Sequence, residues 1–190
     1  KWTFITLILI AFIITLYYIY VELNGQKQNK KVYKEILPLV NKINYYKEKQ
    51  NLDSCLIFLD SAITVVNHRS DSIYSGLLAQ KAEVYFLLND SILAERIARE
   101  VNGRPDNDFP HRNNYEADKK VQMILAKLWE RSNSTGMSET LYKSVLSDAI
   151  ENKDTIIAFE SFVSLLRIYR KNKEIKKSVK IFTEQGEEFL

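Results

Sequence analysis

The sequence is poor in the residues that turn-rich folds and phosphate-binding loops require. It has five glycines and three prolines among 190 residues. These residues supply the special backbone conformations of tight turns, so their scarcity disfavours β folds with many hairpins. It also leaves little material for glycine-rich loops that cradle phosphates. The composition therefore favours a helical chain.

Residues that bind metals or act as nucleophiles are also scarce. Cys55 is the single cysteine, which excludes an intrachain disulfide and a cysteine-based zinc cage. His68 and His111 each lack a His or Cys companion one helical turn away. The glycine-rich phosphate loop, the GxSxG elbow and the HExxH motif are all missing. We therefore expect no catalytic residues, no metal and no cofactor, and predict that the protein is not an enzyme.

Neither sign of charge is in large excess. The chain has 27 basic and 24 acidic residues, a net charge of +3. Binding to nucleic acid normally needs a concentrated basic surface with aromatic side chains between the charges. The strongest basic cluster, which lies near the C-terminus, has no such aromatics, so a nucleic-acid partner is disfavoured. Its members are Arg170, Lys171, Lys173, Lys176, Lys177 and Lys180.

The chain begins with a long apolar run. Residues 2–21 carry no charge, and a helix of this length spans about 30 Å, the thickness of a bilayer's hydrocarbon core. Trp2 at one end and Tyr17, Tyr18 and Tyr20 at the other suit the two membrane interfaces. The alternative is a secretory signal, but the run is longer than a signal's apolar stretch and no small residue follows it for cleavage. The run predicts an uncleaved transmembrane helix.

We accordingly expect a single-pass membrane protein with a membrane anchor over 1–22, a basic juxtamembrane linker over 23–31 and a helical domain over 32–190. Lysines are frequent after the span, whereas only Lys1 precedes it, and this bias favours a cytoplasmic helical domain. Residues upstream of Lys1 would enter the count, so the side of the membrane stays open. The lysines after the span are Lys27, Lys30, Lys31 and Lys34.

Beyond the run, apolar residues recur at steps of three and four, which is one face of an α-helix. Polar segments separate these periodic stretches, and Pro38 is expected to start or kink the first helix. Residues 102–114 concentrate Gly, Pro, Asn and Asp, and predict the longest loop. The periodic stretches are 32–46, 52–66, 73–88, 94–101, 121–132, 141–150, 157–169 and 175–182.

A second pattern joins these helices into pairs. Near the end of the first helix of each pair is a large aromatic residue, and nine residues later the second helix carries a small one. An aromatic ring that fills the wedge between two helices needs a small side chain opposite, or the helices cannot approach. The pattern indicates four antiparallel helical hairpins. The pairs are Tyr46 with Cys55, Tyr85 with Ala94, Trp129 with Ser138, and Tyr169 with Ser178.

The second hairpin resembles the tetratricopeptide repeat most, through Ala82, Tyr85, the turn at Asn89 and Asp90, and Ala94. The resemblance extends over residues 32–185 and implies an all-α fold, a right-handed array of about four antiparallel hairpins after the anchor. The chain departs from the family in its aromatic spacings of 39, 44 and 40 residues, against about 34, and in lacking the proline that closes each unit. Another α-solenoid or a non-repeating helical bundle is the alternative.

The resemblance also implies a concave groove, lined by one helix of each hairpin, that binds a peptide or a partner helix. Its C-terminal half would be basic, and converging Arg and Lys bind carboxylates well, so an acidic peptide or protein segment is the expected partner. The alternative is that these are ordinary solvated charges. The implied groove residues are Asn44, Lys47, Glu48, Glu83, Phe86, Leu87, Lys120, Met123, Lys127, Glu130, Arg131, Val163, Arg167, Arg170 and Lys171.

These observations predict a membrane-anchored scaffold or adaptor that binds protein partners through its groove. The alternative function is the sensory input region of a membrane-bound signalling or transcription-regulatory protein, with an output domain beyond Leu190. Nothing in the sequence predicts an oligomeric state. The anchor's only pair of small residues four apart, Ala11 and Thr15, is too weak to predict helix pairing in the bilayer.

Overall fold

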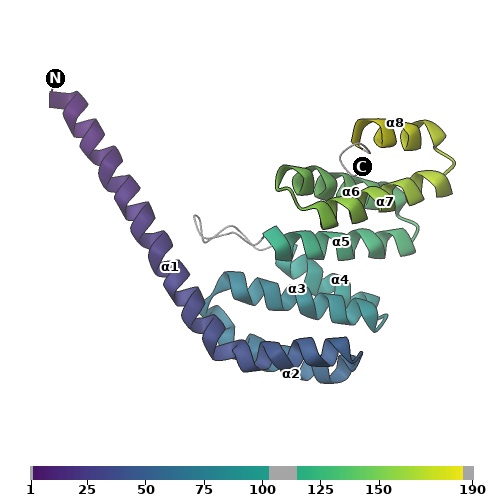
Figure 1. The fold of residues 1–190 in the computed structure, drawn as a ribbon, viewed down its shortest axis with the longest axis horizontal. Coiled ribbons are helices and arrows are strands. Elements are labelled where there is room, and N and C mark those ends of the chain that lie inside the picture. Colours follow the sequence, from purple (N-terminus) through teal and green to yellow (C-terminus); the bar gives the residue numbers. More distant parts are fainter. Residues whose placement is uncertain (1, 103–114, 186–190) are drawn as a thin grey trace. The chain divides into compact units, whose positions relative to one another are not determined.

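The computed structural model describes residues 2–102 and 115–185, of which 2–10, 68 and 185 are described by their backbone alone. Within these ranges the chain is entirely helical, which confirms the all-α prediction for this part (Figure 1). The segment expected to be the longest loop lies outside the described residues, except for Asn102. The elements are α1 (Trp2–Glu48), α2 (Leu52–Val66), the short 3₁₀ helix η1 (Asn67–Arg69), α3 (Asp71–Leu87), α4 (Ser91–Asn102), α5 (Tyr115–Arg131), α6 (Thr135–Glu151), α7 (Thr155–Lys171) and α8 (Ile175–Gln185).

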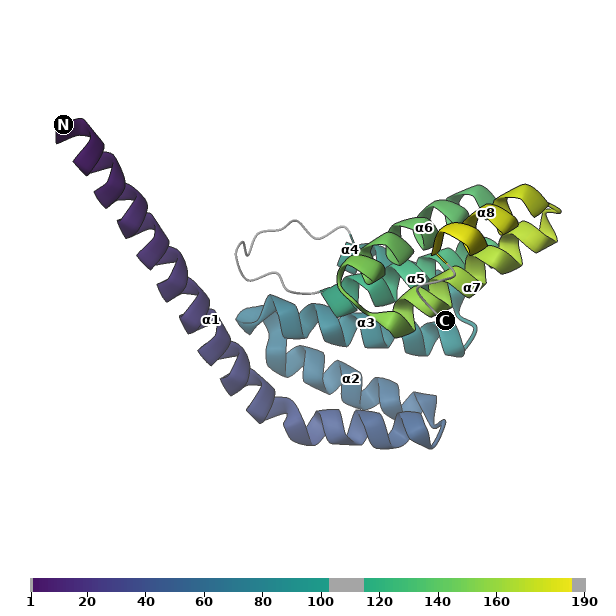
Figure 2. The same ribbon diagram turned by 45° about the horizontal axis from the view of Figure 1, so that its top comes forward.

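Helix α1 runs without a break through the predicted anchor, the linker and the start of the helical domain. Pro38 lies inside it. Figures 1 and 2 both show α1 bending in its C-terminal part, before it reaches α2. A proline within a helix removes one backbone hydrogen bond and clashes with the preceding turn, so it bends the helix. The expected effect of Pro38 is therefore a bend within α1 and not a helix start.

The first half of α1 is not covered by other helices over the residues whose side chains are described. Among those residues, no helix combines the length and the apolar character needed to cross a membrane. The predicted anchor overlaps them only from residue 11 onward. From residue 12 to 23 the large hydrophobic side chains are 45–64 % exposed: Phe12, Ile13, Ile14, Leu16, Tyr17, Tyr18, Ile19, Tyr20 and Leu23.

The chain divides into two compact units, and the boundary lies within α3. Of the described residues, unit 1 comprises 2–80 and 115, and unit 2 comprises 81–102 and 116–185. In unit 1, α1 packs against α2, and side chains of both helices form its buried centre. In unit 2, α6 packs against α7 and α7 against α8. The buried centre of unit 2 includes Ala126, Tyr142, Leu146, Phe162, Leu165, Ile168 and Tyr169.

One turn geometry recurs after each of the four aromatic residues. After Tyr85, Asn89 has a φ of 62°, and the backbone N–H of Asp90 donates to the Tyr85 carbonyl at 2.9 Å. This is the Schellman closure of a helix C-terminus, in which one residue adopts the left-handed conformation. Asp90 then begins α4, because its carboxylate accepts the backbone N–H of Leu93 at 3.0 Å. The equivalent closures follow Tyr46, Trp129 and Tyr169.

The small residues opposite the aromatics are buried in three of the four hairpins. Cys55, Ala94 and Ser138 have no exposed surface, as close helix packing requires. The Ser138 hydroxyl donates to the Ala126 carbonyl at 2.8 Å, so this buried polar group is satisfied. Ser178 is only partly buried, because α8 has a neighbour on one side alone among the described helices.

Candidate docking surface on helices α7 and α8

The structure distributes the predicted groove residues over both units. Asn44, Lys47 and Glu48 belong to unit 1, at the end of α1. The others belong to unit 2, on α3, α5 and α7. Met123 is buried within the centre of unit 2 and does not line an open surface. The remaining positions on α5 and α7 lie near one another, so unit 2 holds most of the predicted groove.

Several basic residues of this set already pair with acidic residues of unit 2. Lys120 Nζ lies 3.3 Å from a Glu83 carboxylate oxygen, and Lys127 Nζ lies 2.5 Å from Glu160. Both pairs are partly exposed, so each contributes little to stability. Their effect is mainly on specificity, because each lysine has a local acidic partner that an incoming carboxylate would have to displace.

Arg167 makes the most complete of these pairs. Its Nε and Nη2 atoms donate to the two carboxylate oxygens of Glu130 at 2.9 and 2.8 Å. The hydrogen bond to Glu130 raises the pKa of Arg167. Tyr142 also donates to Glu130, at 3.4 Å, and burial raises the pKa of Tyr142 to about 12. A bidentate pair of this kind is the strong form of ion pairing, so Arg167 is committed to Glu130.

Arg131 and Lys171 are likewise engaged. The Arg131 guanidinium lies 4.0 Å from the centroid of the Phe86 ring, and it donates to the Asn89 side chain at 3.3 Å. Lys171 donates to the Asn133 side chain at 3.1 Å. The interior of the predicted groove therefore consists of matched charges and a cation–π contact, which favours a structural role for these residues.

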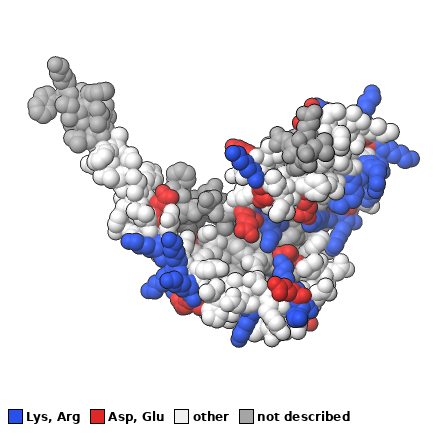
Figure 3. Space-filling model, in the orientation of Figure 1, with Lys and Arg blue, Asp and Glu red and all other residues white. Residues whose placement is uncertain are grey.

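An open groove lies farther along unit 2, between α7 and α8. Its volume is about 860 Å³. Its walls are mainly apolar, and Arg170 and Lys173 provide charge beside them. Basic side chains gather over this C-terminal part of the molecule in Figure 3. The lining residues are Val163, Leu166, Arg167, Arg170, Lys173, Ile175, Ser178, Val179 and Phe182.

The groove is open because α8 has two apolar faces and buries only one. Ile181 turns inward and joins the buried centre of unit 2. Ile175, Val179 and Phe182 follow one another at helical spacing and are 74, 56 and 55 % exposed. Within the described part of the chain no helix covers this second face. A contiguous apolar face of this kind, beside charged groups, is typical of a binding surface.

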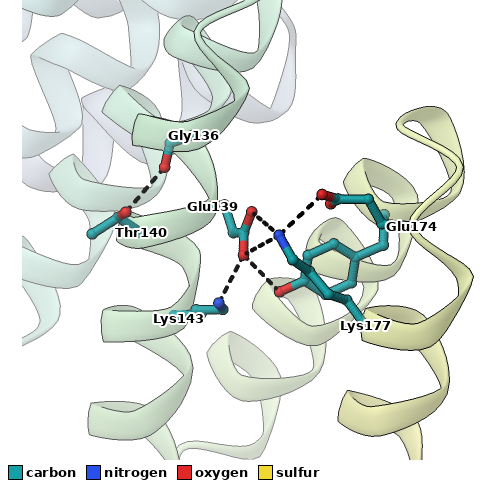
Figure 4. Close-up of polar contacts among 7 residues, drawn as sticks. Gly136, Glu139, Thr140, Lys143, Glu174 and Lys177 are labelled. Carbon is teal, nitrogen blue, oxygen red and sulfur yellow. Dashed lines mark hydrogen bonds and ion pairs between the residues drawn. The ribbon is translucent and has the colours of Figure 1, made fainter.

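A cluster of charged groups connects α8 to α6 and α7 (Figure 4). Glu139 of α6 accepts hydrogen bonds from Lys143 at 2.7 Å and from the Tyr169 hydroxyl at 3.1 Å. Lys177 of α8 lies 3.4 Å from Glu139 and 3.1 Å from Glu174. Glu139 of α6 thus contacts both α7 and α8, which positions α8 and with it one wall of the groove.

These contacts set the ionisation of Glu139. Burial by itself raises the pKa of a carboxyl group, but the hydrogen bond and charge of Lys143 act against it. The hydroxyl of Tyr169 and the charge of Lys177 act in the same direction as Lys143. The result is a pKa below the ordinary 4.5, so Glu139 is ionised at neutral pH.

Sequence reasoning identified only part of the α7–α8 groove. It named Val163, Arg167 and Arg170 on α7 but none of the residues that α8 contributes. The available signal was the apolar stripe of α8 at Ile175, Val179 and Phe182. The lining residues that were missed are Leu166, Lys173, Ile175, Ser178, Val179 and Phe182.

The groove offers apolar contact and positive charge. Among the described residues no group of three His, Cys, Asp or Glu side chains is placed to hold a metal ion. No protein-family model matches this chain, and comparison with characterised proteins finds no similar sequence. The geometry of the α7–α8 groove therefore carries the functional argument.

Proposed function

We propose that this chain is a membrane-tethered protein-docking module whose α7–α8 groove binds an acidic, partly apolar segment of a partner protein. The observation that carries the proposal is the open groove of about 860 Å³, with apolar walls and Arg170 and Lys173 beside them. This volume is within the roughly 300–1,000 Å³ usual for pockets that hold small molecules. An apolar centre with a polar rim is also the usual composition of a protein interface.

The choice of ligand follows from which charges are already occupied. Arg167 is held by Glu130 in a bidentate pair, whereas no ion pair involving Arg170 or Lys173 is found among the described residues. A carboxylate arriving at Arg170 or Lys173 displaces no local acidic partner. An amphipathic helix with leucines on one face and glutamates along its edge matches this arrangement.

The resemblance to tetratricopeptide repeats also supports a partner bound in the α7–α8 groove. The aromatic and small residues and the repeated closure of each hairpin suggest a right-handed array of stacked hairpins. In such an array each hairpin buries a face against the next, and the outer face of an end hairpin lacks that cover. Among the described residues the face formed by α7 and α8 is exposed, and the partner helix packs on it as a neighbouring hairpin would.

The membrane tether is supported by the first part of α1. Residues 2–21 carry no charge, and from residue 12 to 23 their large apolar side chains are exposed. Exposed apolar surface costs about 25 cal/mol per Å² in water, and lipid removes that cost. A tether also raises the effective concentration of the groove for partners at the same membrane.

The test is titration of the protein with a synthetic helical peptide that carries leucines on one face and glutamates along the edge of that face. Arg170→Glu places a negative charge beside the groove, and we expect about tenfold weaker binding, as loss of a charge-assisted hydrogen bond predicts. Lys176→Glu is the matched control, because Lys176 is exposed on α8 but does not line the groove.

Binding that both substitutions weaken equally would show a general charge effect and contradict the proposal, as would binding that neither changes. A photoreactive residue at Val179 gives a second readout in intact cells. We expect it to capture an acidic protein segment, which mass spectrometry identifies. Arg167 is unsuitable for this purpose, since changing it also removes the partner of Glu130.

A further inference from the structure

A stripe of lysines follows the apolar part of α1. Lys27, Lys30, Lys31 and Lys34 are exposed, and their spacing of three, four and seven residues places them on one face of the helix. Figure 3 shows basic side chains gathered beside part of α1. None of the four forms an ion pair within the described part of the chain. We call these residues the lysine stripe.

The continuity of α1 sets the distance of the lysine stripe from the apolar run. At 1.5 Å of rise per residue, Lys27 lies about 9 Å beyond Val21 and Lys34 about 20 Å beyond it. The headgroup layer of a bilayer adds roughly 5–8 Å to each side of the hydrocarbon core. With Val21 at the edge of the hydrocarbon core, the Lys27 side chain reaches the outer part of the headgroup layer, and Lys30 and Lys31 lie within about one Debye length of it.

Two of these lysines also line a hollow between α1 and the first turn of α3. The hollow is about 400 Å³ in volume. The nearby carboxylate of Glu35 is held by Arg69, whose Nη2 and Nη1 atoms lie 2.6 and 2.9 Å from its two oxygens. Arg69 is thus the main partner of Glu35, although the charge of Lys31 also acts on this carboxylate. The residues that line the hollow are Asn29, Lys30, Tyr33, Lys34, Ser72 and Ile73.

We infer that the lysine stripe binds the phosphate headgroups of anionic phospholipids in the membrane that holds residues 2–21. The inference rests on the membrane tether of the proposed function. It adds a lipid specificity that the apolar run does not supply, because an apolar helix inserts into neutral and anionic bilayers alike. Ammonium groups near an anionic surface gain roughly a factor of five in affinity each.

The test uses the full chain reconstituted into liposomes of phosphatidylcholine alone or mixed with phosphatidylglycerol. Resistance to alkaline extraction measures the tether first. A chain that alkaline extraction removes from both liposomes would overturn the tether and, with it, this inference. A chain retained in both leaves the tether standing and moves the test to the lysines.

Acetylation rates of individual lysines, read by mass spectrometry, then test the lysine stripe. We expect phosphatidylglycerol to slow acetylation of Lys27 and Lys30 by about fivefold, with a smaller effect at Lys34, which is farther from the membrane. Lys49 and Lys153 are exposed outside the stripe and serve as references that should not change. Equal rates in the two liposomes, with the tether intact, would overturn the inference.

A double substitution distinguishes a lipid site from a general charge effect. Lys30→Gln with Lys34→Gln should lower the phosphatidylglycerol that copurifies with the protein, whereas Lys49→Gln with Lys153→Gln should leave it unchanged. An equal loss in both variants would contradict the inference. Protection of the stripe by inorganic phosphate in phosphatidylcholine liposomes, equal to that by phosphatidylglycerol, would also contradict it, because it would identify a free anion as the ligand.

Discussion

The hairpins depend on single residues held in the left-handed backbone conformation. Gln50, Asn89, Asn133, Lys153 and Lys173 all have φ between 56° and 62°, and none is glycine. This conformation brings the side chain close to the backbone and costs about 1 kcal/mol for a residue such as lysine. Each turn therefore includes strain that the Schellman hydrogen bonds and the packing of the two helices offset.

Replacing one of these residues by glycine should stabilise the protein. Lys153 has a φ of 58° between α6 and α7. For Lys153→Gly we expect the free energy of unfolding to rise by about 0.5 kcal/mol, because relief of strain exceeds the added entropy of the unfolded chain. Thermal or urea unfolding measures the change.

The neighbouring position provides the control for this prediction. Asn152 has a φ of −87°, and its side-chain amide donates to the Asp148 carbonyl at 2.7 Å. Asn152→Gly removes that bond and gains no relief of strain, so it should lower stability. If both substitutions destabilise the protein to the same extent, the strain at Lys153 is not significant.

At the scale of the helices, neighbouring elements of unit 2 are joined by polar contacts as well as by apolar burial. Lys119 of α5 is a clear case, since it is 6 % exposed and pairs with Asp148 of α6. It also donates to Gln122 at 3.1 Å. Such partly buried pairs contribute little net stability but fix which helices meet and in what register.

The Glu139 cluster makes the stability of unit 2 depend on pH. Because the pKa of Glu139 is lower in the folded state, its carboxylate stabilises the fold above the unfolded pKa of about 4.5. This contribution is lost as the pH falls through that value toward the folded pKa. Glu139→Gln should therefore cost about 1 kcal/mol at pH 7, and less as the pH falls below about 4.

Urea unfolding at several pH values measures this difference. The matched control is Glu151→Gln, which makes the same charge change on the same helix at an exposed position. We expect it to have a small effect that varies little with pH. A cost for Glu139→Gln that is the same at pH 7 and pH 3 would show that packing, and not ionisation, accounts for it.

For the whole molecule, the main contrast is between the exposed start of α1 and the folded part that follows. From residue 12 to 23 the large apolar side chains are exposed, whereas Val32, Ile36 and Ile43 on the same helix are buried. In the described part of unit 1, the side chain of Gln28 joins α1 to η1 by donating to the Arg69 carbonyl at 2.7 Å. The folded part of unit 1 thus includes α1 from about Gln28 onward.

Truncation tests this division. A chain that starts at Lys27 should keep the unfolding midpoint of the full protein but lose retention in phosphatidylcholine liposomes, because it lacks only the exposed apolar segment. A chain that starts at Tyr33 also loses the Gln28 bond, the contact of Asn29 with Ser70 and the buried Val32. It should be less stable by about 2 kcal/mol.

Circular dichroism during heating and flotation of liposomes measure the two properties separately. If the chain that starts at Lys27 has the same unfolding midpoint as the chain that starts at Tyr33, the apolar segment stabilises the fold. The division between an exposed start of α1 and a separate folded part is then wrong. If the chain from Lys27 still floats with phosphatidylcholine, the tether lies elsewhere in the molecule.

The parts of the fold that the sequence predicts are those that depend on local interactions. The helical period of Leu52, Cys55 and Leu59 predicts α2 with its observed bounds, and Asn51 caps it as a local hydrogen bond should. The aromatic and small residues nine apart likewise predict the hairpins, because both residues lie within one chain segment. These features depend on neighbours in sequence, so they follow from it directly.

The charges and the groove depend instead on which helices meet. Arg167 and Glu130 are 37 residues apart, and only packing of α7 near α5 brings them together. The same applies to α8. The helical period of the sequence places Val179 and Phe182 on one apolar face, but whether that face is exposed depends on whether another helix covers it. Helix formation is local, so the apolar period and the capping residues of the sequence predict it. Which helices pack together, and which side chains they bury, depends on contacts between segments far apart in the sequence, and only the folded chain makes those contacts.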